Sequence, residues 1–162
     1  MKALTLYQPW ATLIAIGAKR IETRSWSTNY RGPLAIHAGK NTDFIRGRGK
    51  YYICDEHPFC DVLIKAGLFL FENPFPGAIP LGCIVATCEL VDCILMDEKF
   101  LSEPVYCLGW SVQHPEVAFG DFRLGRYAWM LNKVKLLPEP IPAKGAMGLW
   151  EWSETGSQDA KN

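Results

Sequence analysis

The sequence predicts a single domain of the α+β class. Five or six segments have the alternation or the β-rich composition of strands, and two or three have the spacing of helices. The strands do not alternate regularly with the helices, which is typical of α+β folds. The length of 162 residues suits one domain, since domains commonly hold roughly 100–200 residues. A small mixed barrel with helices on its side and an open sheet both fit these segment lengths.

Local signals mark where the elements begin and end. Pro9 suits the first position of a helix, and Gly17 suits the left-handed conformation that ends one. The stretch GCIVATCELVDCIL is rich in β-forming residues and predicts a long strand whose even-numbered positions are buried. We expect an ordered domain over 1–152 and a frayed tail over 153–162. The expected elements are, in chain order, strand 3–7, helix 8–17, strands 21–26 and 31–39, a helix from about Pro58 to residue 68, strand 82–95, a short helix within the irregular residues 96–123, strand 126–137 and a closing segment at 144–152.

Composition and cysteine spacing exclude several classes of protein. Apolar residues make up 49% of the chain, too many for a disordered segment. The start MKALTLYQPW lacks the apolar region of a signal peptide, and no apolar run reaches the roughly 18 residues of a membrane helix. We therefore predict a cytoplasmic protein with no membrane partner. The six cysteines include no CxxC pair, and Cys83, Cys88 and Cys93 recur every five residues, which alternates between the faces of a strand. We predict buried free thiols, no metal site and no cofactor.

The charge is zero overall but is unevenly distributed. Residues 1–50 carry nine lysines and arginines against two acids, an excess of seven positive charges. Residues 51–162 carry eight basic and fifteen acidic residues, an excess of seven negative charges. Such an asymmetry indicates an anionic partner, with nucleic acid as the first candidate. The alternative is two solvated patches that cancel.

The stretch GAKRIETRSWSTNYRG concentrates side chains that suit nucleotide recognition. Strand alternation places Glu22, Arg24 and Trp26 on one face, with Lys19 just after the preceding helix. Arginine offers a bidentate fork to phosphate or a base edge, and lysine a point charge. Tryptophan offers a stacking surface, and glutamate accepts from an exocyclic amine. The alternative is a surface ion pair between Glu22 and Arg24 and a core role for Trp26.

Five further residues are candidates for the same site, each with a structural alternative. Gln8 either donates to a base or caps the helix, and Trp10 either lines the site or belongs to the core. Arg31 contacts phosphate or flanks a turn. His37 has very small neighbours on its face and either contacts a ligand or is a packed histidine. Lys40 opens a loop with three further basic residues, which holds phosphate or is a solvated charge run.

The order of short motifs resembles one known family. Gly17, Lys19, Glu22 and Arg24 fit the form GxKxxExR, with QPWA before it and RGPLAIHA and GRYAW after it. This pattern resembles the ASCH (activating signal cointegrator homology) domains of the PUA-like superfamily. The resemblance implies a PUA-like mixed β-barrel of five to six strands with flanking helices, and makes residues 41–81 an insertion. It also implies a cleft between the first helix and the barrel that binds RNA or other nucleic acid.

The resemblance leaves an enzymatic alternative open. Some ASCH proteins hydrolyse N4-acetylcytidine, and at least one is a ribonuclease. In such a reaction Glu22 would act as general base, and Lys19 would polarise the carbonyl or stabilise the oxyanion. The amidohydrolases carry threonine where this chain has Glu22, which departs from their pattern. The favoured hypothesis is binding of RNA, single-stranded nucleic acid or a modified nucleoside. A hydrolase is the second, and an adaptor that binds protein through exposed aromatic residues is the third.

Overall fold

The computed structural model describes residues 1–41, 59–68, 79–102 and 116–154. These ranges contain strands and short helices in the mixed order that the sequence predicts, which confirms the α+β class. The elements are β1 (Lys2–Leu6), α1 (Trp10–Ala15), β2 (Ile21–Arg24), β3 (Gly32–Ala38), α2 (Phe59–Lys65), β4 (Cys83–Leu95), α3 (Glu98–Ser102), the 3-10 helix η1 (Glu116–Phe119), β5 (Tyr127–Pro142) and β6 (Leu149–Glu151).

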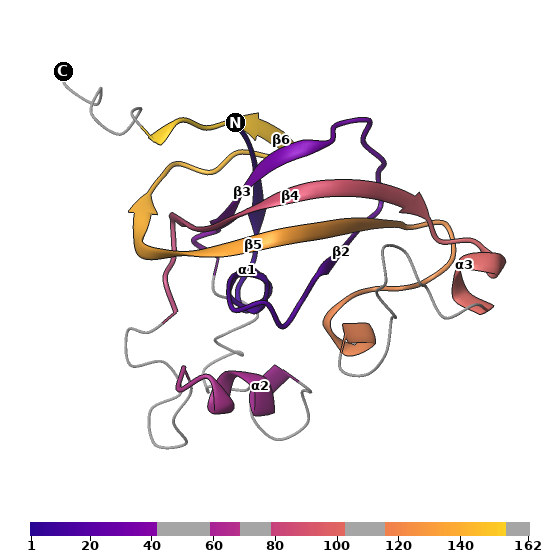
Figure 1. Ribbon diagram of the computed structural model, residues 1–162, viewed down its shortest axis with the longest axis horizontal. Coiled ribbons are helices and arrows are strands. Elements are labelled where there is room, and N and C mark those ends of the chain that lie inside the picture. Colours follow the sequence, from indigo (N-terminus) through magenta and orange to yellow (C-terminus); the bar gives the residue numbers. More distant parts are fainter. Residues whose placement is uncertain (42–58, 69–78, 103–115, 155–162) are drawn as a thin grey trace.

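The strands form one mixed sheet in the order β2-β5-β4-β3-β1-β6. Strands β1 and β3 run parallel, and the other neighbouring pairs are antiparallel. The sheet curls into a half-barrel, in agreement with the expected PUA-like architecture. In Figure 1, β4 and β5 cross the molecule side by side, with α1 seen end-on beneath them and α2 beyond it. Strand β2 lies at one edge of the sheet and pairs with β5, which follows it by about a hundred residues.

Helix α1 is buried on both sides, because it lies between the sheet and a second layer. Ala11 and Ile14 pack in the main core with strand residues such as Leu34, Ile36 and Trp129. On the opposite side of the helix, a smaller cluster joins it to α2 and η1, and its buried members are Leu13, Leu63, Ile79 and Phe119. Each large apolar side chain buried in this way contributes about 1.5–3 kcal/mol. The helix therefore packs against the sheet on one side and holds the segment around η1 on the other.

The ends of α1 set the direction of the chain into β2. The helix is shorter than the predicted 8–17, since Pro9 is its N-cap residue and Ile16 its C-cap. Gly17 has a φ of 77°, which confirms the left-handed ending. The Leu13 carbonyl accepts hydrogen bonds from the amides of Ala18 at 2.9 Å and Lys19 at 3.0 Å. This tight turn directs Lys19 inward.

A β-bulge in β4 changes the faces that the cysteines occupy. The pairing of β4 with β5 shifts between Ile84 and Ala86, so the alternation of side chains is interrupted there. Cys83 and Cys88 consequently pack in the same core cluster, and the prediction that they alternate is wrong. Both are buried free thiols as predicted, and Cys93 is free and half-buried. Burial raises the pKa of the Cys88 thiol to about 12.

Other boundaries differ modestly from the sequence-based expectation. The helix expected from Pro58 is α2, and β5 extends past the expected end at 137 to Pro142. The basic loop after Lys40 and most of the expected tail lie outside the described residues. Among the helices that the structure describes, none has the length and apolar character needed to span a membrane.

Candidate functional site

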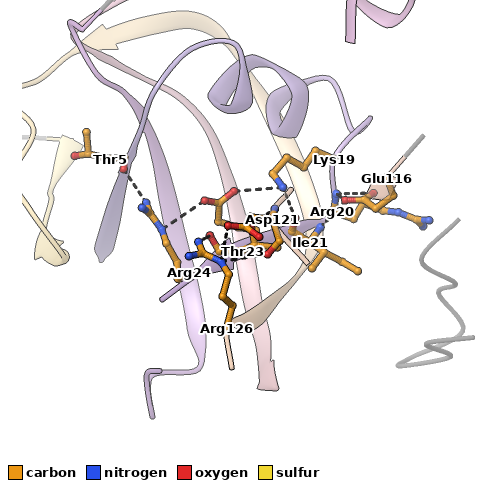
Figure 2. Close-up of polar contacts among 10 residues, drawn as sticks. Thr5, Lys19, Arg20, Ile21, Thr23, Arg24, Glu116, Asp121 and Arg126 are labelled. Carbon is orange, nitrogen blue, oxygen red and sulfur yellow. Dashed lines mark hydrogen bonds and ion pairs between the residues drawn. The ribbon is translucent and has the colours of Figure 1, made fainter. Parts of the chain in front are cut away.

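The motif stretch builds a cluster of charged side chains on β2. The Glu22 carboxylate lies 3.4 Å from Lys19 Nζ through one oxygen and 3.4 Å from Arg24 Nε through the other. Arg24 Nη2 also donates to the Thr5 carbonyl at 2.9 Å, which ties β2 to β1. Figure 2 shows Arg24 reaching Thr5 at one end of this cluster and Glu116 at the other end. The carboxylate is thus held between two cations in a fixed orientation.

Lys19 is fully buried, although lysine is rarely found in a protein interior. Its ammonium group donates to the Ile21 carbonyl and forms the ion pair with Glu22. A buried charge requires such partners, because an unpaired ammonium would be strongly destabilising in a low-dielectric environment. Lys19 therefore supports Glu22 from behind and does not reach the surface in this structure.

A hollow of about 400 Å³ opens in front of Glu22, beside the start of α1. One wall comes from the junction of β1 and α1, where Tyr7 and Trp10 present aromatic rings. The rest of the lining comes from β2 and from a wall that runs from η1 to the start of β5. Besides the two aromatic residues, its polar lining residues are Glu22, Thr23, Arg24, Asp121 and Arg126.

The wall formed by η1 and the residues after it is held to β2 by hydrogen bonds that involve backbone amides. The Glu116 carboxylate is buried and accepts from the amides of Arg20 and Ile21 at 3.0–3.1 Å. Thr23 Oγ1 accepts from the Asp121 amide at 2.9 Å. These contacts close the hollow with residues that lie about a hundred positions from the motif.

Asp121 and Arg126 add a second pair of opposite charges to the lining. Arg126 Nε lies 3.3 Å from the Asp121 carboxylate and donates to its backbone carbonyl. The hydrogen bond from Arg123 lowers the pKa of Asp121 to about 2, and the charges of both arginines act in the same direction. The carboxylates of Glu22 and Asp121 thus face the guanidinium groups of Arg24 and Arg126, and the lining is balanced in charge.

A second hollow of about 250 Å³ adjoins the first. The two share Tyr7 and Arg24 as lining residues. Trp26 lies in the second hollow, edge-on to Trp129 with ring centroids 4.6 Å apart. The loop before β6 also lines this hollow, and its residue Met147 is 96% exposed.

The structure brings together some of the predicted site residues and separates others. Glu22, Arg24, Trp10 and Trp26 line the two hollows, with Lys19 behind them. The remaining predicted residues, which line neither hollow, are Gln8, Arg31, His37 and Lys40.

Two of the separated residues have structural partners. Gln8 is buried, where its Oε1 accepts from the Thr12 amide at 3.0 Å and its Nε2 donates to the Pro80 carbonyl. It therefore caps α1, which is one of its two expected roles. Arg31 Nη2 bonds to Asp92 at 2.7 Å and ties the turn before β3 to β4.

His37 and Lys40 lie at the C-terminal end of β3, whereas Arg31 precedes its first residue. His37 is packed beneath the chain after β5, with Nε2 3.1 Å from the Ala143 carbonyl and its ring edge-on to Trp150. Burial lowers the pKa of His37 against the opposing effect of the hydrogen bond to Ala143. Lys40 is exposed, and its alkyl chain covers Gly82.

Several lining residues were not found from the sequence, namely Tyr7, Thr23, Asp121, Arg126 and Met147. The motif GRYAW could have indicated Arg126. If its strand pairs antiparallel with the motif strand, the first residues of GRYAW lie beside Arg24. The observed pairing does so, with Arg24 opposite Tyr127.

The charge asymmetry between the two halves is partly neutralised within the fold. Lys2 pairs with Glu151 at 2.6 Å, and Arg31 pairs with Asp92 at 2.7 Å. Lys19 and Arg24 pair with Glu22. In residues 1–41, 59–68, 79–102 and 116–154, no three His, Cys, Asp or Glu side chains are placed to hold a metal ion.

Comparison with known proteins defines the class to which this fold and motif belong. The family model of the ASCH domain matches residues 4–134, so the chain belongs to the ASCH domain family. These domains are related to RNA-binding PUA-like proteins. The chain is 36% identical over 159 residues to activating signal cointegrator 1 of Mus musculus and 33% identical over 158 residues to that of Homo sapiens. Each alignment covers 98% of this chain but only 23% of the relative.

Proposed function

We propose that this domain binds RNA, another single-stranded nucleic acid or a modified nucleoside, with a base in the hollow in front of Glu22. The observation that carries the proposal is the fixed carboxylate of Glu22, oriented by Lys19 and Arg24 beside two aromatic side chains. The family supports the same assignment, because ASCH domains are related to RNA-binding proteins.

The chemistry of the lining suits a nucleobase. Glu22 can accept a hydrogen bond from an exocyclic amine such as that of cytosine or adenine. Arg24 and Arg126 can donate to carbonyl, ring-nitrogen or phosphate acceptors. Stacking on an aromatic side chain contributes about 1–3 kcal/mol per base. A base that enters this hollow thus finds an acceptor, donors and a flat apolar surface.

The balanced charge of the lining implies few phosphate contacts. If Arg24 and Arg126 each contact one phosphate, the slope of log affinity against log salt for a single strand is about −1.4. A protein that held nucleic acid through the whole basic segment would have a much steeper slope.

The hydrolytic alternative receives less support from the geometry. Lys19 Nζ is buried and already bonded to Ile21 and Glu22, so it does not face the hollow where a carbonyl would bind. We therefore favour binding without turnover.

The test measures binding and turnover in the same samples. Ribonucleosides, N4-acetylcytidine and short single-stranded RNAs are titrated into the protein by calorimetry, and the mixtures are then analysed by mass spectrometry. We expect retention without product, and an affinity for amine-bearing bases that Glu22→Gln reduces by roughly tenfold. Tyr7→Ala, at a residue that is 48% exposed, should weaken binding of every base.

Matched controls separate these effects from loss of folding. Leu124→Ala changes an exposed apolar side chain that lines neither hollow, and it should bind like the wild type. Thermal unfolding of each variant establishes that it is folded. Absence of binding to all probes, or unchanged binding in both Glu22→Gln and Tyr7→Ala, would overturn the proposal. Release of cytidine from N4-acetylcytidine would replace it with the hydrolytic alternative.

A further inference from the structure

We infer that the site accommodates two successive nucleotides of a single strand, one base in each hollow, with the linking phosphate at Arg24. This inference rests on the proposed function and specifies its ligand. The hollows of about 400 and 250 Å³ adjoin each other and share Tyr7 and Arg24. An isolated nucleoside would use the first hollow and leave the second without an occupant.

The second hollow has the surfaces that a base requires. Trp26 supplies an indole, and Met147 lines the same hollow from the loop before β6. Met147 is 96% exposed, so its thioether is accessible to a ligand in this hollow. Thioether groups are polarisable and make favourable contacts with aromatic rings. A base in contact with Trp26 and Met147 would bury apolar surface that the free protein exposes.

Arg24 lies where the backbone of such a ligand would pass. Its side chain is about a quarter exposed, at the boundary that both hollows share. The contacts to Thr5 and Glu22 run through Nη2 and Nε, so the guanidinium is held in place while further N–H donors remain for an anion. Consecutive nucleotides are joined by one phosphodiester. The Arg24 guanidinium at the boundary of the two hollows therefore corresponds to the phosphate that links two neighbouring bases.

The same arrangement favours a single strand over a duplex. Bases in a duplex are paired and stacked on one another, so they cannot enter two separate hollows without being unpaired first. Single strands present unstacked bases to aromatic side chains at no such cost. The inferred ligand is thus an unpaired dinucleotide step within RNA or single-stranded DNA.

The test compares ligands of one and two bases. Ribonucleosides, their monophosphates and the ribodinucleoside monophosphates are titrated into the wild-type protein by NMR and calorimetry. We expect the best dinucleotide to bind at least about tenfold more tightly than either constituent nucleoside. A dinucleotide with an uncharged methylphosphonate linkage should lose much of this difference, because Arg24 then lacks its anion.

Variants assign the gain in affinity to the second hollow. Met147→Ala should lower the ratio of dinucleotide to nucleoside affinity, whereas Leu136→Ala, at an exposed leucine that lines neither hollow, should leave the ratio unchanged. The dinucleotide should also shift the indole resonance of Trp26. Replacement of Trp26 itself is avoided, because it packs on Trp129.

The outcomes distinguish this inference from the proposed function. If nucleosides bind but dinucleotides bind no more tightly, the two-base inference is refuted and the proposed function stands. A ratio that Met147→Ala leaves unchanged also refutes the second hollow as a base site. If no nucleoside, mononucleotide or dinucleotide binds, the two-base inference fails. If short single-stranded RNA does not bind either, the proposed function fails as well.

Discussion

Replacing Glu116 by alanine should destabilise the domain by about 3 kcal/mol, because this carboxylate fastens the wall of the hollow to β2. It accepts from the Arg20 and Ile21 amides at 3.0–3.1 Å. Hydrogen bonds to a charged group contribute about 1.5–3 kcal/mol each. Ile21 is buried, so in the alanine variant its amide would lose its hydrogen-bond acceptor without gaining a water molecule. Arg20 is exposed, so water can replace part of the hydrogen bond that its amide loses.

The assay is urea denaturation followed by tryptophan fluorescence at neutral pH. For a chain of this size, a loss of about 3 kcal/mol corresponds to a fall in Tm of about 6–12 °C. Glu116→Gln keeps one carbonyl acceptor and should cost about half as much. Glu139→Ala, at an exposed glutamate near the end of β5, is the control and should have little effect. A Glu116→Ala protein within about 0.5 kcal/mol of the wild type would refute this account of how the wall is held.

Three further predictions concern buried ionisable groups. Lys19→Met should destabilise the domain by about 3 kcal/mol, because the buried Glu22 carboxylate would lose the ammonium group that pairs with one of its oxygens. A loss of less than about 1 kcal/mol in thermal unfolding would contradict this pairing. Because the folded-state pKa of His37 lies below its unfolded value, the unfolded chain binds the proton more readily. The stability contributed by neutral His37 is therefore present above about pH 6.5 and is lost as the pH falls toward the folded pKa. His37→Gln should flatten this dependence between about pH 5 and pH 7 in urea titrations, and an unchanged slope would refute it. Cys88, whose pKa is raised to about 12, should resist alkylation at pH 8 in the folded protein and react in urea, as peptide mass spectrometry can measure; rapid labelling without denaturant would contradict its burial.

Sequence reasoning succeeded where the signal is local. The left-handed conformation of Gly17 follows from the steric freedom of glycine at a helix end. Strand alternation correctly put Glu22 and Arg24 on one side, where they form an ion pair. Buried positions in β3 followed from the same period of two, with Leu34 and Ile36 both in the core.

The sequence was uninformative where contacts join distant parts of the chain. No local rule indicates that the segment after Glu116 would close the hollow, because its hydrogen bonds to Arg20 and Ile21 span about a hundred residues. The burial of Lys19 was equally hidden, since lysine is normally exposed and only the positions of Glu22 and the Ile21 carbonyl make burial tolerable.

Two expectations failed or weakened for structural reasons. The β-bulge beside Ile84 placed Cys83 and Cys88 in one cluster, and a bulge leaves no clear mark in a β-rich sequence. The basic excess of the first fifty residues indicated an anionic partner, with nucleic acid as the first candidate. In the described residues, part of that excess is neutralised by acids from the second half, as in the pair of Lys2 with Glu151.

The most direct test of the central claim is a titration of isotope-labelled protein with single-stranded RNA at two salt concentrations. We expect the indole resonance of Trp10 to shift on binding, and the affinity to fall about sevenfold between about 50 and 200 mM salt, as the slope for two phosphate contacts requires. Tyr7→Ala should weaken this binding at both concentrations. RNA that leaves the Trp10 resonance unmoved, or that binds Tyr7→Ala as tightly as the wild type, would show that the hollow in front of Glu22 is not the binding site.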